Sequence, residues 1–460
     1  MDAVRKWPAG RAAAGWWRRR PHPRAVPAAE WRHRPAARAL PAADAPATTE
    51  PSAFAFGALV VFTFILLTAP QNIVPALAPL RIALMAAVVS IGAHLWHCLS
   101  HRRPLRPGLE LQITLALIAW AALTVPFSSW PSGSLAFLLT VYLKTVAIFW
   151  LLGELVTTLP RLRLIVWTLA LLSLPLAVTG VRNFLAGAFL SDAIQIRRIV
   201  GFDAPLTENP NDLALVLNLI LPLTIALLLG ARSVLPRVVL LGVVGLNAAG
   251  VIATFSRAGF LTLVAILAAY FWKLRKHPAA RWRWAAVGIA LACLPLLPAG
   301  YSSRLETITD IEADDTGSAK ARWIDTLAAV RYMVGHPVVG AGIGMNTLVL
   351  NEMRGATWRA VHNAYLEYGV ELGVLGVALF VALLVMALRK ASIIERRAAE
   401  RAPELVHLAG GIQVSLLAFA LAAFFHPNGY QFPFYYMAGL AVALPAVYDA
   451  EVARSPERPR

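Results

Sequence analysis

HNAYLEYGVELGVLGVALFVALLVMAL at residues 362–388 is a polar His-Asn pair followed by a long apolar run. A helix needs about 20 mainly apolar residues to cross a bilayer, and this run is long enough. The segment therefore predicts a membrane-spanning helix with His362 at its mouth, where chemistry at a membrane surface is feasible.

The composition extends this prediction to the whole chain. Hydrophobic residues make up 58% and charged residues 15% of the 460 residues. The apolar residues come in long runs, and an open sheet cannot satisfy its backbone in lipid. We predict an all-α polytopic membrane protein with about 12 transmembrane helices. The predicted spans are 54–69, 80–98, 111–127, 134–156, 163–181, 211–230, 234–253, 257–272, 283–299, 364–388, 406–426 and 433–449.

The basic residues predict the orientation. With a cytoplasmic N-terminus, roughly 30 of the 42 Lys and Arg residues fall in inside segments, as the positive-inside rule requires. Both termini are then cytoplasmic. The formal charge of +17 is mainly this topology signal, and without a soluble basic domain it does not indicate nucleic-acid binding.

The remaining Lys and Arg residues lie outside or within the bilayer, where the positive-inside rule does not favour them. Such charges have a partner, either an acidic side chain or an anionic ligand. An ion pair is favoured for Arg304 and Lys320, beside the acidic run at 306–315. The full set is Arg81, Lys144, Arg182, Arg197, Arg198, Arg257 and six residues in the loop 300–363.

The termini lack apolar spans. Residues 1–53, rich in Arg, Pro, Ala and Trp, predict a disordered basic cytoplasmic tail, or a start codon placed too far upstream. Residues 450–460 predict a short cytoplasmic tail. The two cysteines, Cys98 and Cys293, have no metal or redox spacing, and the histidines are scattered, so no metal or other cofactor is expected.

The predicted spans divide the chain into 54–299, with nine helices and an outside loop at 182–211, and 364–449, with three. Between them lies the large outside loop 300–363. Residues 321–337 have helical spacing and stop at His336-Pro337. GAGIGMN at 340–346 is a Gly-rich turn, which predicts either a phosphate site or a tight connection.

Several motifs around these loops carry a resemblance. TFSRAGFL at 254–261 contains Arg-x3-Leu, and His362-Asn363 is followed after nine residues by GVLG at 373–376. Arg198-x2-Gly precedes Asn-Pro-Asn at 209–211. Over about 54–450 the chain resembles the O-antigen ligase family, within a superfamily that includes O-antigen polymerases and protein O-oligosaccharyltransferases.

The resemblance implies a GT-C-like glycosyltransferase in the bacterial inner membrane with a periplasmic active site. Such ligases move a polysaccharide from undecaprenyl diphosphate to a sugar hydroxyl of lipid A-core without a metal. The donor lipid, the lipid A-core acceptor and membrane lipids are the expected partners. The reaction needs a cationic clamp for the diphosphate and a base for the acceptor hydroxyl.

The resemblance assigns these roles to matching residues. His362 is the candidate catalytic base, and direct in-line attack would invert the anomer. Arg257, Arg322 and Arg198 are candidates for the diphosphate clamp, because a guanidinium binds phosphate oxygens bidentately. The alternatives are a helix-capping role for His362, a membrane anchor for Arg257, and for Arg322 an ion pair with Asp314, Asp315 or Asp325.

Other residues are candidates for supporting roles. Arg197 could substitute for its neighbour, and Glu367 or Glu371 would orient the imidazole. Lys144, in mid-span, would pair with Glu154 or face a polar groove. His426 would line the acceptor site or simply end its helix before Pro427.

Other functions remain as alternatives. An O-antigen or exopolysaccharide polymerase is second, since Arg331-x10-Gly342 matches a polymerase pattern once. A protein O-oligosaccharyltransferase follows, disfavoured because no soluble C-terminal domain is predicted. A lipid or glycan transporter comes last, because the unusual charges gather at one outer face and not across several spans.

Overall fold

The computed structural model describes residues 50–102, 105, 108–189, 198–276, 284, 317–354 and 358–454. This part of the chain is helical, and Thr49–Arg460 forms one compact unit. Eight of its helices are long and apolar enough to cross a membrane. An all-α polytopic membrane protein is therefore confirmed. Residues 1–49 of the predicted tail 1–53, the span 283–299 (except residue 284) and residues 300–316 lie outside the described residues.

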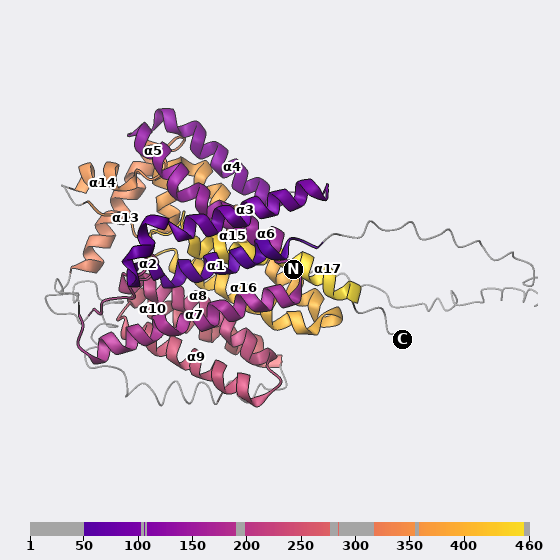
Figure 1. The fold of residues 1–460 in the computed structure, drawn as a ribbon. Coiled ribbons are helices and arrows are strands. Elements are labelled where there is room, and N and C mark those ends of the chain that lie inside the picture. The colour runs from indigo at the N-terminus through magenta and orange to yellow at the C-terminus, as the bar shows by residue number, and fades with distance from the viewer. Residues whose placement is uncertain are drawn as a thin grey trace, which may run out of the picture. The chain divides into compact units, whose positions relative to one another are not determined.

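Each of the remaining predicted spans is occupied by helix (Figure 1). The long helices are α1 Ala53–Thr68, α3 Ile82–Ser100, α4 Leu109–Thr124, α6 Leu143–Leu155, α7 Leu159–Leu185, α8 Pro210–Gly230, α9 Val234–Ala253, α10 Arg257–Lys273, α15 Ala364–Arg401, α16 Pro403–Ala422 and α17 Phe432–Arg454. The shorter ones are α2 Pro70–Ile73, α5 Pro131–Phe137, α13 Ser318–Gly335 and α14 Asn346–Arg354. Short 3-10 turns follow α2, α4 and α10, and a π-helical stretch at Leu138–Tyr142 joins α5 to α6.

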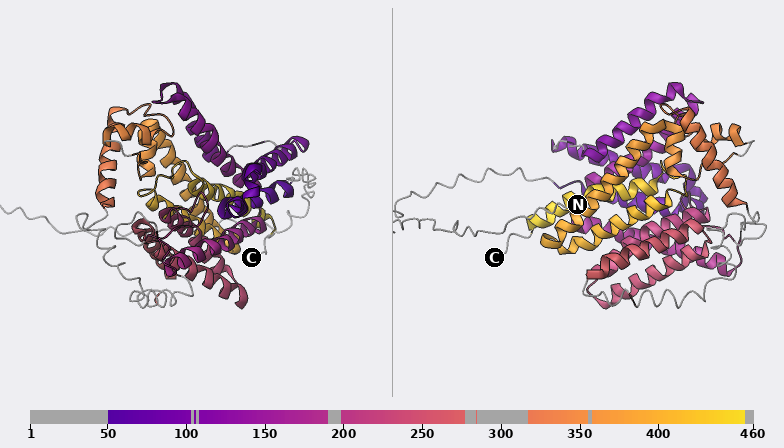
Figure 2. Two further views of the ribbon diagram at one scale, coloured as in Figure 1. Left: turned by 60° about the vertical axis from the view of Figure 1, so that its left-hand side comes forward. Right: turned by 180° about the vertical axis from the view of Figure 1, so that it is seen from behind.

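The core of this unit is built around α8 and α16. Helix α16 packs against both α8 and α15, and α17 packs against α6 and α15. Most side chains of α8 are buried all round, as expected for a helix that is apolar on every face. By contrast α3 and α9 expose large apolar side chains such as Val88 and Val238, which suits contact with lipid hydrocarbon. Figure 2 shows α3 at the edge of the bundle.

Two helix ends are explained by their local sequence. Asn209 caps α8: its side chain accepts a hydrogen bond from the Asn211 amide, and Pro210 occupies the first turn. The predicted loop helix is α13, which ends at Gly335 with His336 as its C-cap residue. The proline that follows cannot continue the helix, which explains this stop.

Helix α15 is broken one-quarter of the way along. Gly373 has φ 67° and ψ −165°, so it cannot be part of a continuous helix. The amides of Ala341 and Gly342 donate to the Val370 and Glu371 carbonyls at 2.8 and 2.9 Å. Trp120 Nε1 donates to the Leu372 carbonyl at 2.9 Å. The loop before α14 thus satisfies backbone groups that the break would leave unpaired in lipid.

The Gly-rich turn at 340–346 is held by the same helix. Gly340, Gly342 and Gly344 all have positive φ, at 70°, 92° and 79°, which favours glycine. The buried Glu371 carboxylate accepts hydrogen bonds from the Gly344 amide at 2.7 Å and from the Asn346 amide at 3.1 Å. These amides are occupied, so the turn is a tight connection, and the phosphate-site interpretation is not supported.

The break predicts that Gly373→Ala destabilises the protein. A Cβ at this position would lie 2.4 Å from the Val338 carbonyl oxygen, and the positive φ is itself strained for alanine. We expect a loss of stability of at least about 1–3 kcal/mol, measured as a lower melting temperature in detergent. Gly242→Ala in α9 is the control, because nothing lies within 4 Å of its Cβ position. An equal effect of the two substitutions would contradict a structural role for the break.

Candidate active site

Asn363 forms the N-cap of α15 and fixes the start of the helix. Its side-chain oxygen accepts hydrogen bonds from the Tyr365 and Leu366 amides at 3.0 and 3.1 Å. The capping role therefore belongs to Asn363, one position after the histidine. This explains the polar pair at the mouth of the span, and it leaves the imidazole of His362 outside the cap.

The backbone on either side of His362 is held by distant segments. The Val361 amide donates to Asn346 Oδ1 at 3.1 Å, and Asn346 in turn donates from Nδ2 to Glu371 at 2.6 Å. The Ala364 amide donates to the Ala423 carbonyl at 2.7 Å, at the end of α16. These bonds fix the backbone position of the histidine.

The imidazole of His362 is half-buried and carries a nitrogen without a partner. Nδ1 is buried and makes no hydrogen bond to the described residues. Burial first, and then the nearby Arg322 guanidinium, lower the pKa of His362 to about 4, although Asp325 opposes the shift. The imidazole is therefore neutral near pH 7 and can accept a proton.

Arg322 lies in the second turn of α13 and acts electrostatically on the two histidines of the site. Its charge lowers the pKa of both His362 and His426. Asp325, one of the three predicted ion-pair partners of Arg322, forms ion pairs with two other arginines. Arg354 Nη1 lies 2.6 Å and Arg359 Nη2 lies 2.8 Å from Asp325 Oδ1. The other two candidates, at positions 314 and 315, lie outside the described residues.

Arg257 and Arg198 form a second pair of neighbouring cations. Arg257 is the first residue of α10, after Ser256, whose Oγ caps the helix by accepting from the Gly259 amide at 3.1 Å. The pKa of Arg198 is lowered by burial and by the Arg257 charge, whereas Asp212 raises it. Like charges held together in this way attract an anion such as a diphosphate.

Packing requires glycine at position 201, the last position of the Arg198-x2-Gly motif. A Cβ on Gly201 would lie 2.1 Å from the Thr207 carbonyl oxygen, so only glycine fits this turn. The Gly201 amide donates to the Glu208 carbonyl at 3.1 Å. The motif spacing thus places Arg198 at one end of a closed turn that leads directly into α8.

His426 and Asp212 connect the two groups of cations. His426 is buried, with Nδ1 at 2.9 Å from the Ala422 carbonyl and Nε2 at 3.2 Å from the Asn211 carbonyl. Burial lowers its pKa, Asp212 raises it, and Arg322 lowers it. His426 therefore ties the end of α16 to the start of α8. The side chain is held in place by these contacts, and only 3% of the residue is exposed. That His426 lines the acceptor site stays a prediction.

Of the predicted site residues, the structure thus gathers His362 with Arg322 and Arg198 with Arg257, with His426 between them. Glu367 instead accepts a hydrogen bond from the Gly429 amide at 2.9 Å, and in the described part of the chain it forms no ion pair with His362. The predicted Lys144–Glu154 pair is not formed: Glu154 Oε2 lies 3.7 Å from His94 Nε2, and Lys144 lines a separate cavity. The remaining candidate, residue 197, lies outside the described residues.

Sequence reasoning missed three residues that shape the site. Arg359 acts on the pKa of His362, Asp212 acts on those of Arg198 and His426, and Asn346 holds the backbone before His362. Arg359 is one of the six basic residues of the loop 300–363, and the sequence predicted no individual role for it. Asp212 directly follows Asn-Pro-Asn in the first turn of α8, where an acidic residue is common without any role in a site. Within the described ranges, no cluster of His, Cys, Asp or Glu is placed to hold a metal ion.

A comparison with protein families supports the resemblance. Residues 241–381 match the family model described as O-antigen ligase. The matched segment includes Arg257, Arg322 and His362, and it excludes Arg198 and His426. The family resemblance predicted from the sequence is confirmed over these residues. No curated protein matches the chain.

The electrostatic arrangement predicts that Arg322→Gln raises the pKa of His362. Removing a cation stabilises the imidazolium, so the pKa moves up from about 4 toward its ordinary value, although burial still opposes the full return. The rate of imidazole acylation by diethylpyrocarbonate, followed by mass spectrometry of the His362 peptide, rises with pH through this pKa. Arg331→Gln, an exposed arginine on the same helix, is the control and leaves the midpoint unchanged. An unchanged midpoint in Arg322→Gln would contradict the arrangement.

Proposed function

We propose that this protein is an O-antigen ligase with a GT-C-like fold. It would transfer a polysaccharide from undecaprenyl diphosphate to a sugar hydroxyl of lipid A-core, with inversion and without a metal. The observation that carries the proposal is the neutral imidazole of His362 beside Arg322, in an electrostatic network with Arg257 and Arg198. The match of residues 241–381 to the O-antigen ligase model supports the same superfamily.

The arginines form the donor site in this proposal. A diphosphate carries several negative oxygens, and guanidinium groups bind them bidentately without losing their charge. Arg257 and Arg198 are close enough for one to lower the pKa of the other, so a bound anion relieves their repulsion. Arg322 reaches the same network through His426. The clamp stabilises the negative charge that develops on the leaving diphosphate.

His362 is the base in this proposal. One of its ring nitrogens takes the proton of the acceptor hydroxyl while the hydroxyl oxygen bonds to the anomeric carbon of the donor sugar. The bond from that carbon to the diphosphate oxygen breaks, and its electron pair remains on the diphosphate. Binding of the anionic donor also offsets the effect of Arg322 and raises the pKa of His362 toward neutrality, which makes the imidazole a stronger base.

The positions of the helix ends support placing the proposed site on one side of the membrane. Arg257 opens α10, Asp212 lies in the first turn of α8, His362 precedes α15 and His426 follows α16. Consecutive spans run in opposite directions, so these ends share one face. The positive-inside distribution of Lys and Arg supports assigning that face to the periplasm of a bacterial inner membrane.

The polymerase alternative rested on Arg331 and Gly342. Gly342 has φ 92°, and a Cβ there would lie 2.1 Å from Ser128 Oγ. Packing by itself requires glycine at position 342. The Arg331-x10-Gly342 spacing therefore gives polymerase activity no separate support. Ligase and polymerase remain distinguishable by their products, because a polymerase leaves the glycan on its lipid carrier.

The proposal predicts the outcome of complementation in a strain that lacks its own ligase. The wild-type chain should restore polymer attached to lipid A-core, seen as lipopolysaccharide banding. His362→Ala should lower the amount formed per unit time by about 10²–10⁴-fold, the usual contribution of a general base. Arg257→Lys should also be impaired, because an ammonium keeps the charge but not the bidentate geometry.

Membrane levels of each variant must equal those of wild type. Arg331→Gln serves as the matched control, because Arg331 is an exposed arginine on the same loop helix as Arg322. A wild-type chain that leaves the lipid A-core bare, with a normal ladder on the carrier, would contradict ligase activity. Full activity of His362→Ala would rule out its role as the base.

A further inference from the structure

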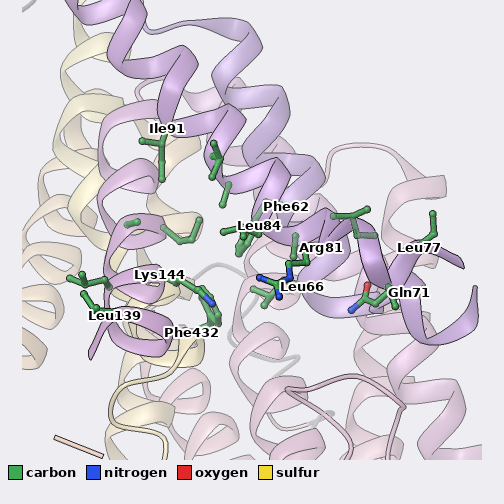
Figure 3. Close-up of a pocket in the computed structure, with 18 residues that line it drawn as sticks. Phe62, Leu66, Gln71, Leu77, Arg81, Leu84, Ile91, Leu139, Lys144 and Phe432 are labelled. Carbon is green, nitrogen blue, oxygen red and sulfur yellow. The ribbon is translucent and has the colours of Figure 1, made fainter. Parts of the chain in front are cut away.

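A cavity of about 600 Å³ lies between α1, α3 and α6, away from the residues of the candidate active site (Figure 3). Its walls are almost entirely apolar. The lining residues Leu84, Val88 and Leu139 are 42%, 57% and 51% exposed, so the cavity opens through the side of the bundle. In a bilayer that opening meets hydrocarbon, and a cavity of this size accommodates a lipid chain.

Three polar side chains interrupt this apolar lining. Arg81 is the N-cap residue of α3, and Lys144 lies in the first turn of α6. Figure 3 shows their charged ends inside the cavity at a similar level, with Gln71 beyond Arg81. Gln71 Oε1 is buried and accepts no hydrogen bond from the described residues. No acidic residue lines the cavity.

These groups define what the cavity would hold. In the described part of the chain neither Arg81 nor Lys144 has an acidic partner, and an unpaired cation at membrane depth is costly. A phosphate would neutralise both, and its hydrocarbon chain would fill the apolar walls. The free acceptor of Gln71 adds a site for a hydroxyl group of the ligand.

We propose that this cavity is a binding site for an anionic phospholipid with a hydroxyl-bearing headgroup, of which phosphatidylglycerol is the simplest. Its phosphate lies between Arg81 and Lys144, a headgroup hydroxyl donates to Gln71 Oε1, and one acyl chain enters the cavity. The site is separate from the proposed donor clamp, whose arginines come from α10, α13 and the loop before α8. None of these clamp arginines lines the cavity.

The position of the cavity relates the lipid to the Arg198 loop. Asn72, next to Gln71, donates from Nδ2 to the carbonyl and to the side chain of Asp203, each at 3.0 Å. Asp203 belongs to the turn that begins at Gly201. A lipid that holds Gln71 and Arg81 therefore braces the segment on which this turn rests.

The test is lipid binding by the full purified chain, so it does not depend on ligase activity. The chain is delipidated in detergent and titrated with phosphatidylglycerol or phosphatidylcholine, and the bound lipid is counted by native mass spectrometry. We expect tighter binding of phosphatidylglycerol. The double variant Arg81→Met with Lys144→Met should weaken that binding by about tenfold or more, as expected for loss of charge-assisted contacts.

Two variants that should keep the binding, Lys144→Arg and Arg182→Met, guard against misfolding. Lys144→Arg keeps the charge and should keep the binding, whereas Ala147→Phe keeps both cations but fills the cavity and should weaken it. Arg182→Met, an exposed arginine at the end of α7, should bind as wild type does. Equal binding of the two phospholipids, or wild-type binding by both the double variant and Ala147→Phe, would overturn the proposal. So would displacement of phosphatidylglycerol by equimolar undecaprenyl diphosphate, since the cavity would then belong to the donor lipid.

Discussion

The hydrogen bonds between Glu371 and the Gly-rich turn are the constraint on which the rest of the site depends. The buried carboxylate accepts from the Gly344 and Asn346 amides and from the Asn346 side chain. A carboxylate buried in a membrane bundle must be satisfied in this way, because burial removes the water that would otherwise solvate it. Its bonds fix the outside loop onto α15, next to the break at Gly373, and Asn346 then holds the backbone before His362.

A second layer of the structure is electrostatic. The buried Asp325 holds Arg354 and Arg359, so the loop helices α13 and α14 are bound to the segment that leads to His362. Other cations of the site are set near one another with Asp212 and His426 between them. In the proposed function, such an arrangement keeps the imidazole neutral before the anionic donor arrives and would make it more basic afterwards. Donor binding and proton transfer would then be coupled through charge.

Several features could be predicted from the sequence, since they depend on local chemistry. Long apolar runs specify the spans, and Asn-Pro-Asn at 209–211 marks the start of α8. Helix α15 continues to Arg401, beyond its predicted end, because Ala391, Ile394 and Ala398 keep an apolar stripe against the bundle within a charged stretch. Window averaging of hydropathy cannot detect such a stripe.

The sequence by itself determined an all-helical membrane protein, the identity of the motif residues, and the family they resemble. Only the tertiary structure decided what those residues contact. Gly373 and Gly376 follow His362 in the motif, but only the fold shows that Gly373 breaks a helix against the loop at 337–342. Glu371 was expected to face His362 and binds the turn instead, and Lys144 lines a cavity apart from Glu154. The reason is physical: spacing along one helix fixes which face a side chain occupies, whereas its partner comes from segments far away in the chain.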